Sequence, residues 1–539
     1  MTRLPDLVRR SAERFPEAVA LGPARSPGGG LSYAQLQMLM ERGAALLRDA
    51  GLMPGDTVLL SLEPCPAWPV AFFSILEAGL IAVPLPAETP LASAAGVAAF
   101  AGARVAVVGQ RTRGLDVGSG VRCVPVEELL RAEPSVGREP HEAMTPSNHG
   151  ADTPRSPELA LLAFTSGSTQ KPRAVELTHA SILANLQALL QVRQATPGDS
   201  FLSMLPPAHL FELTVGLLGP LACGARIVYA PSLMPHRLLA ALREEKITHA
   251  LSVPALLDIL YEEVVNELVE AGVVEPVRRE QSLAETARRV REDLNEIDRE
   301  RLRTSLRERI GTSFHTLVVG GAALDPAWAD ITAAVGLRLE VGYGLTEASP
   351  IVSLALAAQS PPGSAGRPLP GLEVRLDENH EILVRGPSVM RGYWRDPEAT
   401  AEGLRDGWLH TGDSGRLDAD GFLFITGRLK EAIVTAAGET LYPEEVEPYY
   451  DSPLFAERCV AALPGPQGND LPTLFVVPIS PDADEQALRH TFEDLRAAAP
   501  ARFRVTNLVR LAGPLPRTAL GKIRRRVVAQ EWQQRGATP

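Results

Sequence analysis

Short apolar runs that alternate with helical segments place the strongest constraint on the fold of this chain. Four of these runs are Thr57–Leu62, Ile81–Val83, Arg104–Val108 and Leu159–Phe164, and segments of helical period lie between the earlier ones. Strands that are buried on both faces have such unbroken apolar runs, and helical connections between them favour parallel neighbours. The pattern predicts an α/β fold with doubly wound, mostly parallel sheets.

Two helices of this pattern have N-cap residues that are visible in the sequence. Ser32 precedes a segment whose apolar positions, among them Leu36 and Leu47, follow the helical period as far as Gly51. Thr178 stands in the same position before a second apolar segment of helical period. We expect a helix to begin directly after each of these hydroxyl residues.

The length, charge and cysteine content limit the class of protein. A chain of 539 residues exceeds what one core accommodates, so we expect at least two domains. A net charge of -12 provides no positive field for nucleic acid. The four cysteines are far apart and lack metal spacing, which is typical of a reducing, cytoplasmic location. No signal peptide or transmembrane segment is predicted, so any membrane contact is expected to be peripheral.

A hydroxyl-rich loop follows the last of the four apolar runs. Its hydroxyls and backbone N–H groups suit a polyphosphate, although an ordinary polar turn is the simpler interpretation of the loop alone. No Gly-Lys-Ser/Thr closes the loop, which excludes a Walker A sequence. The loop consists of Thr165, Ser166, Gly167, Ser168 and Thr169.

Two later strands end in small or polar residues that could belong to the same site. Thr316–Val319 leads into Gly320-Gly-Ala-Ala-Leu324, and Leu339–Val341 leads into Gly342-Tyr-Gly-Leu-Thr-Glu347. Ligands of parallel sheets bind at the carboxyl ends of the strands, so we expect these loops beside the hydroxyl-rich loop. His209 lies on a proline-constrained turn, and taken alone it is more simply structural than catalytic.

Three other segments are interpreted without a functional role. Gly198–Leu202 looks like a carrier-protein attachment site, but its position between a helix and a strand indicates a turn. Asp418–Gly421 lacks the later ligands of a calcium loop and is predicted to be a hairpin turn. The charge-dense segment Tyr261–Arg309 is predicted to form surface helices.

Together these blocks resemble the adenylate-forming, acyl-activating superfamily, and within it the long-chain acyl-CoA synthetases. The resemblance covers nearly the whole chain. Further blocks that carry it are His410-Thr-Gly-Asp413, Gly427-Arg-Leu-Lys430, Gly438, Pro443-Glu-Glu-Val-Glu447 and Pro516-Arg-Thr-Ala-Leu-Gly-Lys522. The resemblance implies a large N-terminal domain over residues 1–427, which includes a small β-barrel-like part, and a small, mobile α+β C-terminal domain over residues 428–539.

The resemblance implies a ligase that joins a carboxylic acid to ATP, releases pyrophosphate, and transfers the acyl group from acyl-AMP to coenzyme A. Both first reactants are anionic, so positioning and charge neutralisation are the main catalytic tasks. The resemblance implies that the hydroxyl-rich loop Thr165–Thr169 would hold the β- and γ-phosphates. Thr346 would contact the α-phosphate and Glu347 would bind Mg²⁺.

The nucleoside contacts implied by the resemblance come from later blocks. Tyr343, followed by Gly344, would stack on adenine, and Asp413 would accept hydrogen bonds from the ribose hydroxyls. Arg428 would help to hold the ribose or a phosphate. The close wall of the nucleoside site would consist of Gly320, Gly321 and Ala322.

Four more residues are assigned roles by the resemblance. Lys522 would bridge the substrate carboxylate and the α-phosphate, and Lys430 would be the hinge about which the small domain rotates. After the rotation Gly438 would face the pantetheine tunnel. His209 would gate the carboxylate pocket.

The substrate prediction leaves alternatives open. A medium- or long-chain fatty acid is favoured because Pro206–Glu212, Phe314–Pro326 and the long charged insertion look most like fatty-acid-activating members. The alternatives are an aromatic acid, or an acyl-carrier protein as the acceptor. A pseudoenzyme that binds nucleotide or acyl groups is the alternative of another class. It is suggested by Gln170, Arg173 and Ala174, which stand where the family usually has Gly, Lys and Gly.

Overall fold

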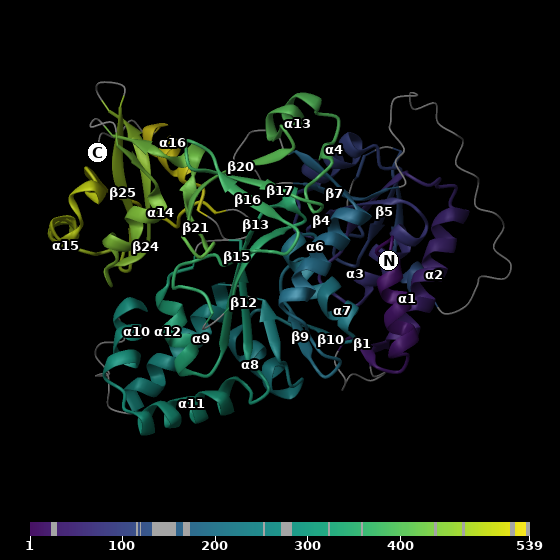
Figure 1. Ribbon diagram of the computed structural model, residues 1–539, viewed down its shortest axis with the longest axis horizontal. Helices are drawn as coiled ribbons and strands as arrows, with labels where there is room; N and C mark the ends of the chain where they lie inside the picture. The colour runs from purple at the N-terminus through teal and green to yellow at the C-terminus, as the bar shows by residue number, and fades with distance from the viewer. Residues whose placement is uncertain are drawn as a thin grey trace.

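The body of the molecule contains two large, parallel-rich sheets, as Figure 1 shows. The structure is a computed structural model, and it describes residues 1–22, 30–114, 117–118, 120–131, 158–164, 173–251, 254–270, 283–321, 324–356, 359–435, 439–465, 469–517 and 523–534. The predicted fold class is confirmed: a large α/β part is followed by a smaller α+β part.

The larger sheet has nine strands, and those in its middle are parallel. In spatial order they are β15 (Arg367–Pro368), β14 (Ile351–Leu356), β13 (Arg338–Gly344), β12 (Thr316–Gly320), β11 (His249–Leu251), β9 (Ser200–Ser203), β10 (Arg226–Tyr229), β1 (Val19–Leu21) and β2 (Leu31–Ser32). Only the pairs that involve β14, β15 and β2 are antiparallel. The strands from β1 to β13 therefore all begin at one edge of the sheet and end at the opposite edge.

The second sheet has seven strands and is also mostly parallel. Its order is β18 (Gly392–Tyr393), β8 (Ala174–Thr178), β7 (Leu159–Phe164), β4 (Ile81–Leu85), β3 (Thr57–Ser61), β5 (Val105–Val108) and β6 (Arg122–Pro125). The four apolar runs of the sequence thus form β3, β4, β5 and β7, and they are adjacent in this sheet.

Helices connect the strands, and their first turns follow the predicted caps. Ser32 and Thr178 each accept a hydrogen bond from the backbone N–H three residues later, at Gln35 and Ser181, in reciprocal capping boxes. The helices of the large part are α1 (Pro5–Arg14), α2 (Tyr33–Asp49), α3 (Ala67–Glu77), α4 (Leu91–Ala101), α5 (Val126–Leu130), α6 (His179–Val192), α7 (Gly219–Cys223), α8 (Pro235–Glu244), α9 (Pro254–Glu270), α10 (Leu283–Glu292), α11 (Glu296–Ile310), α12 (Ala327–Ala334) and α13 (Pro397–Gly403).

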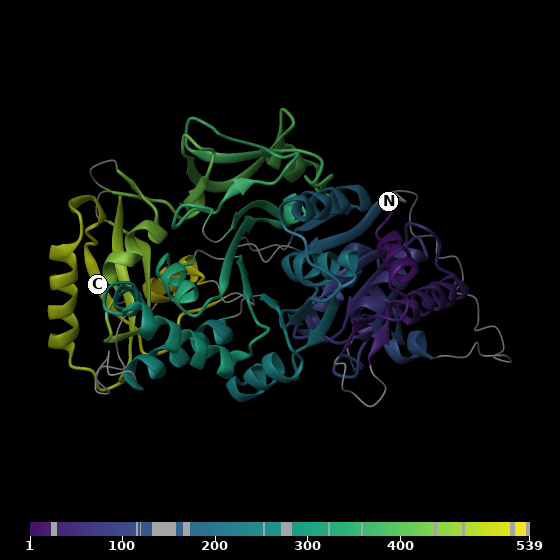
Figure 2. The same cartoon turned by 60° about the horizontal axis from the view of Figure 1, so that its bottom comes forward.

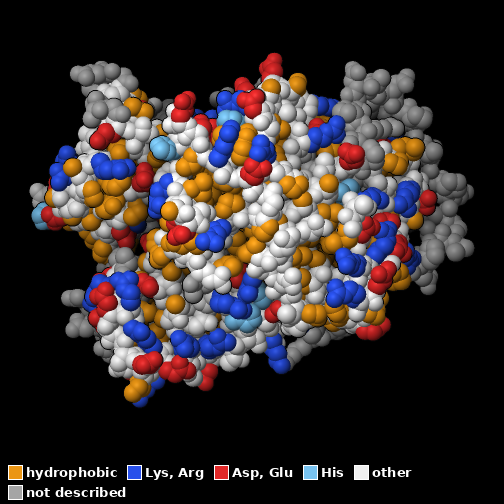
Figure 3. All heavy atoms as spheres, viewed as in Figure 1, with side chains coloured by type: hydrophobic (Ala, Val, Ile, Leu, Met, Phe, Trp, Pro, Cys, Tyr) orange, Lys and Arg blue, Asp and Glu red, His pale blue; other side chains and the backbone are white. Residues whose placement is uncertain are grey.

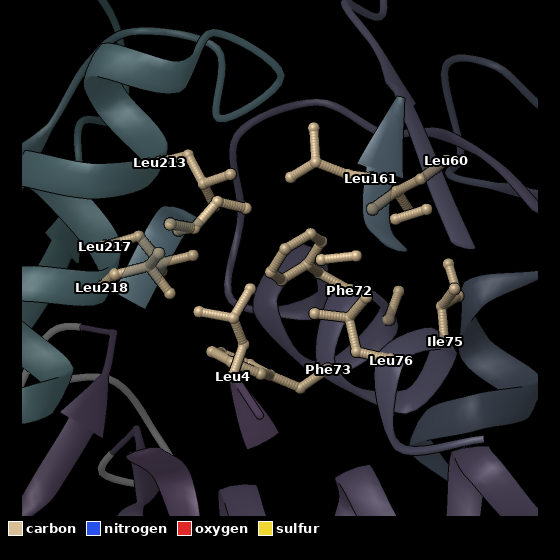
Figure 4. Packing of buried hydrophobic residues seen from close by; sticks show 14 of the residues in the cluster. Leu4, Leu60, Phe72, Phe73, Ile75, Leu76, Leu161, Leu213, Leu217 and Leu218 are labelled. Carbon is tan, nitrogen blue, oxygen red and sulfur yellow. The ribbon is translucent and has the colours of Figure 1, made fainter. Parts of the chain in front are cut away.

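The main core lies where α1, α3 and the π-helical turn Glu212–Leu218 meet the second sheet, as Figure 4 shows. Leu4, Phe72 and Phe73 are fully buried, and Leu213 and Leu217 approach them from the π-helical turn. Burial of a side chain of this size contributes about 1.5–3 kcal/mol. This packing fixes the turn that carries His209 against the rest of the molecule.

The charge-dense segment forms α9, α10 and α11, as predicted, but these helices also bury an apolar face. Val264, Leu268, Leu302 and Leu306 belong to one buried cluster with residues of β12 and α12. Their charged residues pair with one another on the outside, for example in the ion pair between Arg288 and Glu285. The insertion is therefore an integral layer on the nine-stranded sheet.

The small β-barrel-like part is a five-stranded antiparallel sheet. It contains β16 (Glu373–Leu376), β17 (Glu381–Arg385), β20 (Trp408–Leu417), β19 (Leu404–Arg405) and β21 (Leu423–Arg428). The predicted hairpin turn at Asp418–Gly421 joins β20 to β21, with the Gly421 N–H donating to the Asp418 carbonyl over 3.1 Å. Figure 2 shows this sheet beside the other two.

The remaining elements form the small C-terminal part, seen at the left of Figure 2. They are β22 (Ile433–Val434), β23 (Thr440–Leu441), α14 (Pro443–Val446), β24 (Phe455–Pro464), β25 (Asp470–Pro478), α15 (Glu485–Ala498), β26 (Asn507–Arg510) and α16 (Arg525–Gln534). This part has apolar clusters of its own, one of them around Tyr450, Leu474 and Phe492. The division after residue 427 remains a prediction. Among the described residues, no helix has the length and apolar character that a membrane crossing requires.

Candidate active site

The two predicted strand ends meet at the carboxyl edge of the nine-stranded sheet. β12 and β13 pair in parallel with Gly320 opposite Gly342, and a 3₁₀ turn, η3 (Thr346–Ala348), follows β13. Tyr343 and Glu347 thereby come to the same edge as Gly320. Several predicted site residues lie outside the described residues: Thr165, Ser166, Gly167, Ser168, Thr169, Ala322, Gly438 and Lys522.

A buried carboxylate, Asp413, contacts two of the other predicted nucleoside residues. It lies on β20 opposite Arg428 of β21, and its side chain is almost completely buried. The Tyr343 hydroxyl donates to its Oδ2 over 2.8 Å, and the Arg428 Nε lies 2.8 Å from its Oδ1. Each carboxylate oxygen can accept more than one hydrogen bond. The arrangement can therefore present a fixed, negatively charged acceptor to a pair of hydroxyl groups.

The protonation states of this trio are well defined. Burial raises the pKa of Tyr343 well above its usual range, and the Asp413 charge adds to the increase, so Tyr343 is a neutral donor. Burial alone would lower the pKa of Arg428, but the charge of Asp413, together with those of Glu431 and Glu347, raises the pKa above its usual range. Arg428 therefore stays cationic beside Asp413.

Glu347 is held by a residue that the sequence analysis did not identify. The Tyr393 hydroxyl donates to Glu347 Oε1 over 2.9 Å, and the Met390 N–H donates to the Glu347 carbonyl over 2.7 Å. The side chain is thereby fixed through one oxygen, and the second can face a ligand. Carboxylate oxygen is the ligand type that Mg²⁺ prefers, so the donor fits the predicted role.

Two of the three unusual loop residues are described, and both are accommodated. The guanidinium of Arg173 lies over the Tyr393 ring, 5.3 Å from its centroid, so it contacts the residue that holds Glu347. Ala174 begins β8 in regular pairing, and its carbonyl accepts the Trp394 N–H over 2.8 Å. A strand position does not require glycine. Gln170 lies outside the described residues.

His209 begins the turn that leads into the π-helical segment. The Leu213 N–H donates to the His209 carbonyl over 2.9 Å, while the side-chain Nε2 is buried without a hydrogen-bond partner among the described residues. Burial lowers the pKa of His209, so the ring is neutral at pH 7. Two residues later the Phe211 ring packs on Gly320, where an added Cβ would lie 2.8 Å from a ring carbon.

An apolar cavity of about 50 Å³ lies beside this turn, between α6 and the nine-stranded sheet. Its apolar walls include Leu189, Phe201, Phe211, Val215, Val318 and Leu354. Gly342 lies at one part of the wall, whereas Arg193, Glu340 and His249 form a polar part. The Arg193 Nε is 2.7 Å from Glu340 Oε1, and the Glu340 side chain is buried, so an ion pair limits the cavity. No sequence pattern predicted this pair.

A family model described as AMP-binding enzyme matches residues 8–394, most of the large part. The chain belongs to the AMP-binding enzyme family. The adenylate-forming resemblance inferred from the sequence is therefore confirmed.

The similarity of this AMP-binding enzyme to its relatives extends over nearly its whole length. It is 30% identical over 535 residues to a feruloyl-CoA synthase from Amycolatopsis sp, covering 95% of this chain and 96% of that protein. It is 26% identical over 589 residues to a long-chain-fatty-acid–CoA ligase from Bacillus subtilis, covering 98% and 94%. The solved O-succinylbenzoate coenzyme A synthetase from Bacillus subtilis, in complex with ATP and magnesium ion, has the same fold, with a TM-score of 0.75 at 22% identity over 96% of this chain and 98% of that chain.

The predicted hinge residue of this AMP-binding enzyme lies between β21 and β22, in a 3₁₀ turn over Leu429–Glu431. The Lys430 carbonyl accepts a hydrogen bond of 2.8 Å from Arg526, and Glu431 pairs with Arg525 at 3.1 Å. Arg525 also pairs with Glu444 and Glu447, each at 2.9 Å. The residues just after Lys430 are thus fixed to α14 and α16. Arg517 and Ile523, which flank the residues around Lys522 that lie outside the described part of the chain, form an antiparallel bridge.

One buried carboxyl group near His209 was not anticipated. Glu212 is fully buried in the π-helical turn, where the Ser203 hydroxyl donates to its Oε1 over 2.5 Å and Oε2 has no partner among the described residues. Burial raises the pKa of Glu212 to about 8. Gly216 leaves room for this carboxyl group, since an added Cβ there would lie 2.7 Å from it. Glu212 is therefore protonated at neutral pH.

This raised pKa predicts a pH-dependent loss of stability that Glu212→Gln removes. Between its ordinary pKa of 4.5 and about 8, the folded chain holds a proton that the unfolded chain releases, so stability falls as pH rises. The contribution is up to about 1.4 kcal/mol per pH unit. Urea unfolding at several pH values should show a shallower decline for Glu212→Gln than for the wild type. Exposed Glu17→Gln is the matched control, and parallel curves for wild type and Glu212→Gln would contradict the assignment.

Proposed function

We propose that this chain is an AMP-forming acid–CoA ligase, which converts a carboxylic acid through acyl-AMP to an acyl-CoA thioester and releases AMP and pyrophosphate. The observation that carries the proposal is the buried Asp413 carboxylate, held by Tyr343 and Arg428 beside the strand end that carries Glu347. A fixed acceptor of this kind suits the two ribose hydroxyls of ATP. Membership of the AMP-binding family supports the same assignment.

In the proposed adenylation step, positive charge offsets the charge of two anionic reactants. Glu347, positioned by Tyr393, would hold Mg²⁺, which when bound neutralises phosphate charge. Thr346 would contact the α-phosphate, the loop Thr165–Thr169 the outer phosphates, and Lys522 both the acid and the α-phosphate. His209 would border the substrate carboxylate as a neutral ring. The four cysteines form no disulfide, which supports a reducing, cytoplasmic compartment.

We further propose that the acid is compact and aromatic. The walls of the cavity are mostly apolar, but the Arg193–Glu340 ion pair limits its extent. A long alkyl chain would have to displace this pair, whose Glu340 carboxylate is buried, at a cost of several kcal/mol. An aryl acid with a polar group remote from its carboxylate would fill the cavity and meet the polar part of the wall. The similarity to a feruloyl-CoA synthase supports this choice.

A medium- or long-chain fatty acid is the second candidate. Leu189, Val318 and Leu354 line the cavity with aliphatic carbon, and similarity to a long-chain-fatty-acid–CoA ligase extends over 98% of this chain. Widening of the narrow cavity would be needed for either acid, since about 50 Å³ holds little more than a water or two.

The function is tested by AMP release from ATP and Mg²⁺ across a panel of aromatic and aliphatic acids, with and without coenzyme A. We expect release that depends on both the acid and coenzyme A, with aromatic acids ranked first. Lys522→Ala is the control, and it should retain the fold while losing about 100-fold or more of ATP–pyrophosphate exchange. ATP binding without AMP production for any acid would indicate the pseudoenzyme and refute the proposal.

The double variant Arg193→Leu with Glu340→Leu tests whether the ion pair limits the length of the acid that the cavity accepts. Because both charges leave together, the fold should survive, whereas a single Arg193→Leu leaves a buried carboxylate and should cost about 3–5 kcal/mol of stability. Competition between an aryl acid and a long-chain acid should shift about tenfold in kcat/KM toward the long chain. An unchanged preference in the folded double variant would exclude the ion pair as a determinant of chain length.

The hinge assignment is tested by Lys430→Pro. The 3₁₀ backbone at this position is compatible with proline, but proline fixes φ and restricts rotation. Thioester formation should slow by about tenfold or more, while ATP–pyrophosphate exchange changes little. Lys430→Ala serves as the control because it removes the side chain without stiffening the backbone. Equal loss of both half-reactions in Lys430→Pro would count against the hinge.

A further inference from the structure

A second cluster of polar side chains lies at the amino edge of the nine-stranded sheet, opposite the candidate active site. Asp199 immediately precedes β9, His249 is the first residue of β11, and His315 immediately precedes β12. These three strands are adjacent in the order β12, β11, β9. Figure 3 shows histidine side chains at the surface beside Lys and Arg side chains, in the area that Figure 1 labels β9 and α8. The parallel arrangement has brought together residues 50 and more positions apart.

The three side chains converge on a small volume. Asp199 Oδ1 lies 3.7 Å from His249 Nδ1 and 3.9 Å from His315 Nε2. One ligand atom from each residue lies within 4.8 Å of the others. Ligand atoms at about 2.0–2.1 Å from a tetrahedral Zn²⁺ are about 3.3 Å apart, so closure around an ion needs shifts of the order of 1 Å or less.

Neighbouring groups hold two of the three side chains in this orientation. The Thr196 N–H and hydroxyl both donate to Asp199 Oδ2, over 2.7 and 2.9 Å, which directs Oδ1 toward the histidines. The His249 ring stacks on Phe201 with centroids 4.4 Å apart and an interplanar angle of 7°. Hydrogen bonds and packing around ligands orient them in metal sites.

We propose that Asp199, His249 and His315 bind a divalent transition-metal ion, Zn²⁺ in preference to Mg²⁺. Two imidazole nitrogens and one carboxylate oxygen are a donor set of intermediate softness that suits Zn²⁺ or Co²⁺, whereas Mg²⁺ takes oxygen ligands. The ion ties together the starts of three central strands. The ion takes no part in the proposed acid-activation chemistry, although one of its ligands, His249, also belongs to the polar wall of the acid cavity.

The protonation of the cluster agrees with this role. Burial lowers the pKa of His249 to about 3 and also lowers that of His315, so both rings are neutral at pH 7. Burial alone would raise the pKa of Asp199, but the hydrogen bonds from Thr196, together with smaller contributions from His249 and Thr248, lower it. The cluster therefore offers two neutral nitrogen donors and one anionic oxygen donor.

The hydroxyl groups beside the rings are compatible with the ligand tautomers. Thr248 Oγ1 lies 2.8 Å from His249 Nδ1, and it also lies 3.1 Å from the Ser200 carbonyl, which remains its acceptor when the ion takes Nδ1. Thr316 Oγ1 lies 2.8 Å from His315 Nδ1 and can accept the proton of that nitrogen while Nε2 binds the ion.

Among the cations near the rings, which include Arg193, Arg338 contacts a ring nitrogen directly and competes with the metal. Arg338 Nη2 lies 2.8 Å from His315 Nδ1, and a donor at Nδ1 places the ring proton on Nε2, which is the ligand atom. Arg338 is exposed, so metal binding displaces it without opening the core. Removal of this guanidinium should therefore strengthen metal binding. A cluster with only a structural role would show no such effect.

The test is metal titration of the full chain after treatment with a chelator. Calorimetry should show about one Zn²⁺ bound per chain, Co²⁺ should give a visible absorption band, and Mg²⁺ should do neither. Bound Zn²⁺ should raise the thermal midpoint because only the folded chain assembles the site.

Three variants separate a built site from adventitious binding. His315→Gln should weaken Zn²⁺ binding by roughly 100-fold or more, and Arg338→Gln should tighten it by about tenfold. His236→Gln is the matched control, since His236 is exposed on α8 and outside the cluster, and it should bind Zn²⁺ as the wild type does.

Three results would overturn the proposal. They are no Zn²⁺ binding by the wild type, equal affinity in wild type and His315→Gln, and displacement of Zn²⁺ by Mg²⁺ at similar concentration. Where His315→Gln fails to fold, the comparison of Arg338→Gln with the wild type decides, and unchanged affinity there refutes the site.

Discussion

Parallel pairing of β1, β10, β9, β11, β12 and β13 determines which strand ends share an edge of the nine-stranded sheet. Because all these strands run in one direction, their last residues share one edge and their first residues share the other. Gly320 and Gly344 end two of the strands, and the turn with Glu347 follows at that edge. His249 and the residues before β9 and β12 gather at the opposite edge. A single topological constraint thus creates two separate chemical regions on one sheet.

The features that the sequence predicts well are local. Ser32 and Thr178 cap their helices through contacts three residues away. The apolar runs, which form adjacent strands, are recognised as buried strands from their own residues, without knowledge of the strands with which they pair. The pairing of Asp413 with Arg428 is predictable from the sequence, since both residues belong to one predicted hairpin. The family resemblance implies a role for each site residue, whereas the contacts among the described residues show where these residues lie.

Features formed by distant residues escaped prediction for a physical reason. Tyr393 reaches Glu347 across 46 positions, and Arg193, at the C-terminal end of α6, reaches Glu340 on β13. No local sequence pattern marks Tyr393 or Arg193 as a contact residue, because a tyrosine or an arginine at such positions is equally suited to a solvated surface. The sequence predicts Asp199 only as part of a turn, in which it lies, whereas its orientation toward two histidines depends on the strand order.

The Arg525 cluster has a consequence for the energetics of the proposed domain rotation. Glu431 is fixed to α16 through Arg525, and the preceding carbonyl of Lys430 is held by Arg526. The backbone torsions left to change are therefore those between Arg428, the last residue of β21, and the Lys430 carbonyl. Fixing one residue costs roughly 1–2 kcal/mol of conformational entropy. Selection of either orientation of the small domain would thus carry a low entropic cost, and modest differences in ligand contacts would be enough to choose between the two half-reactions.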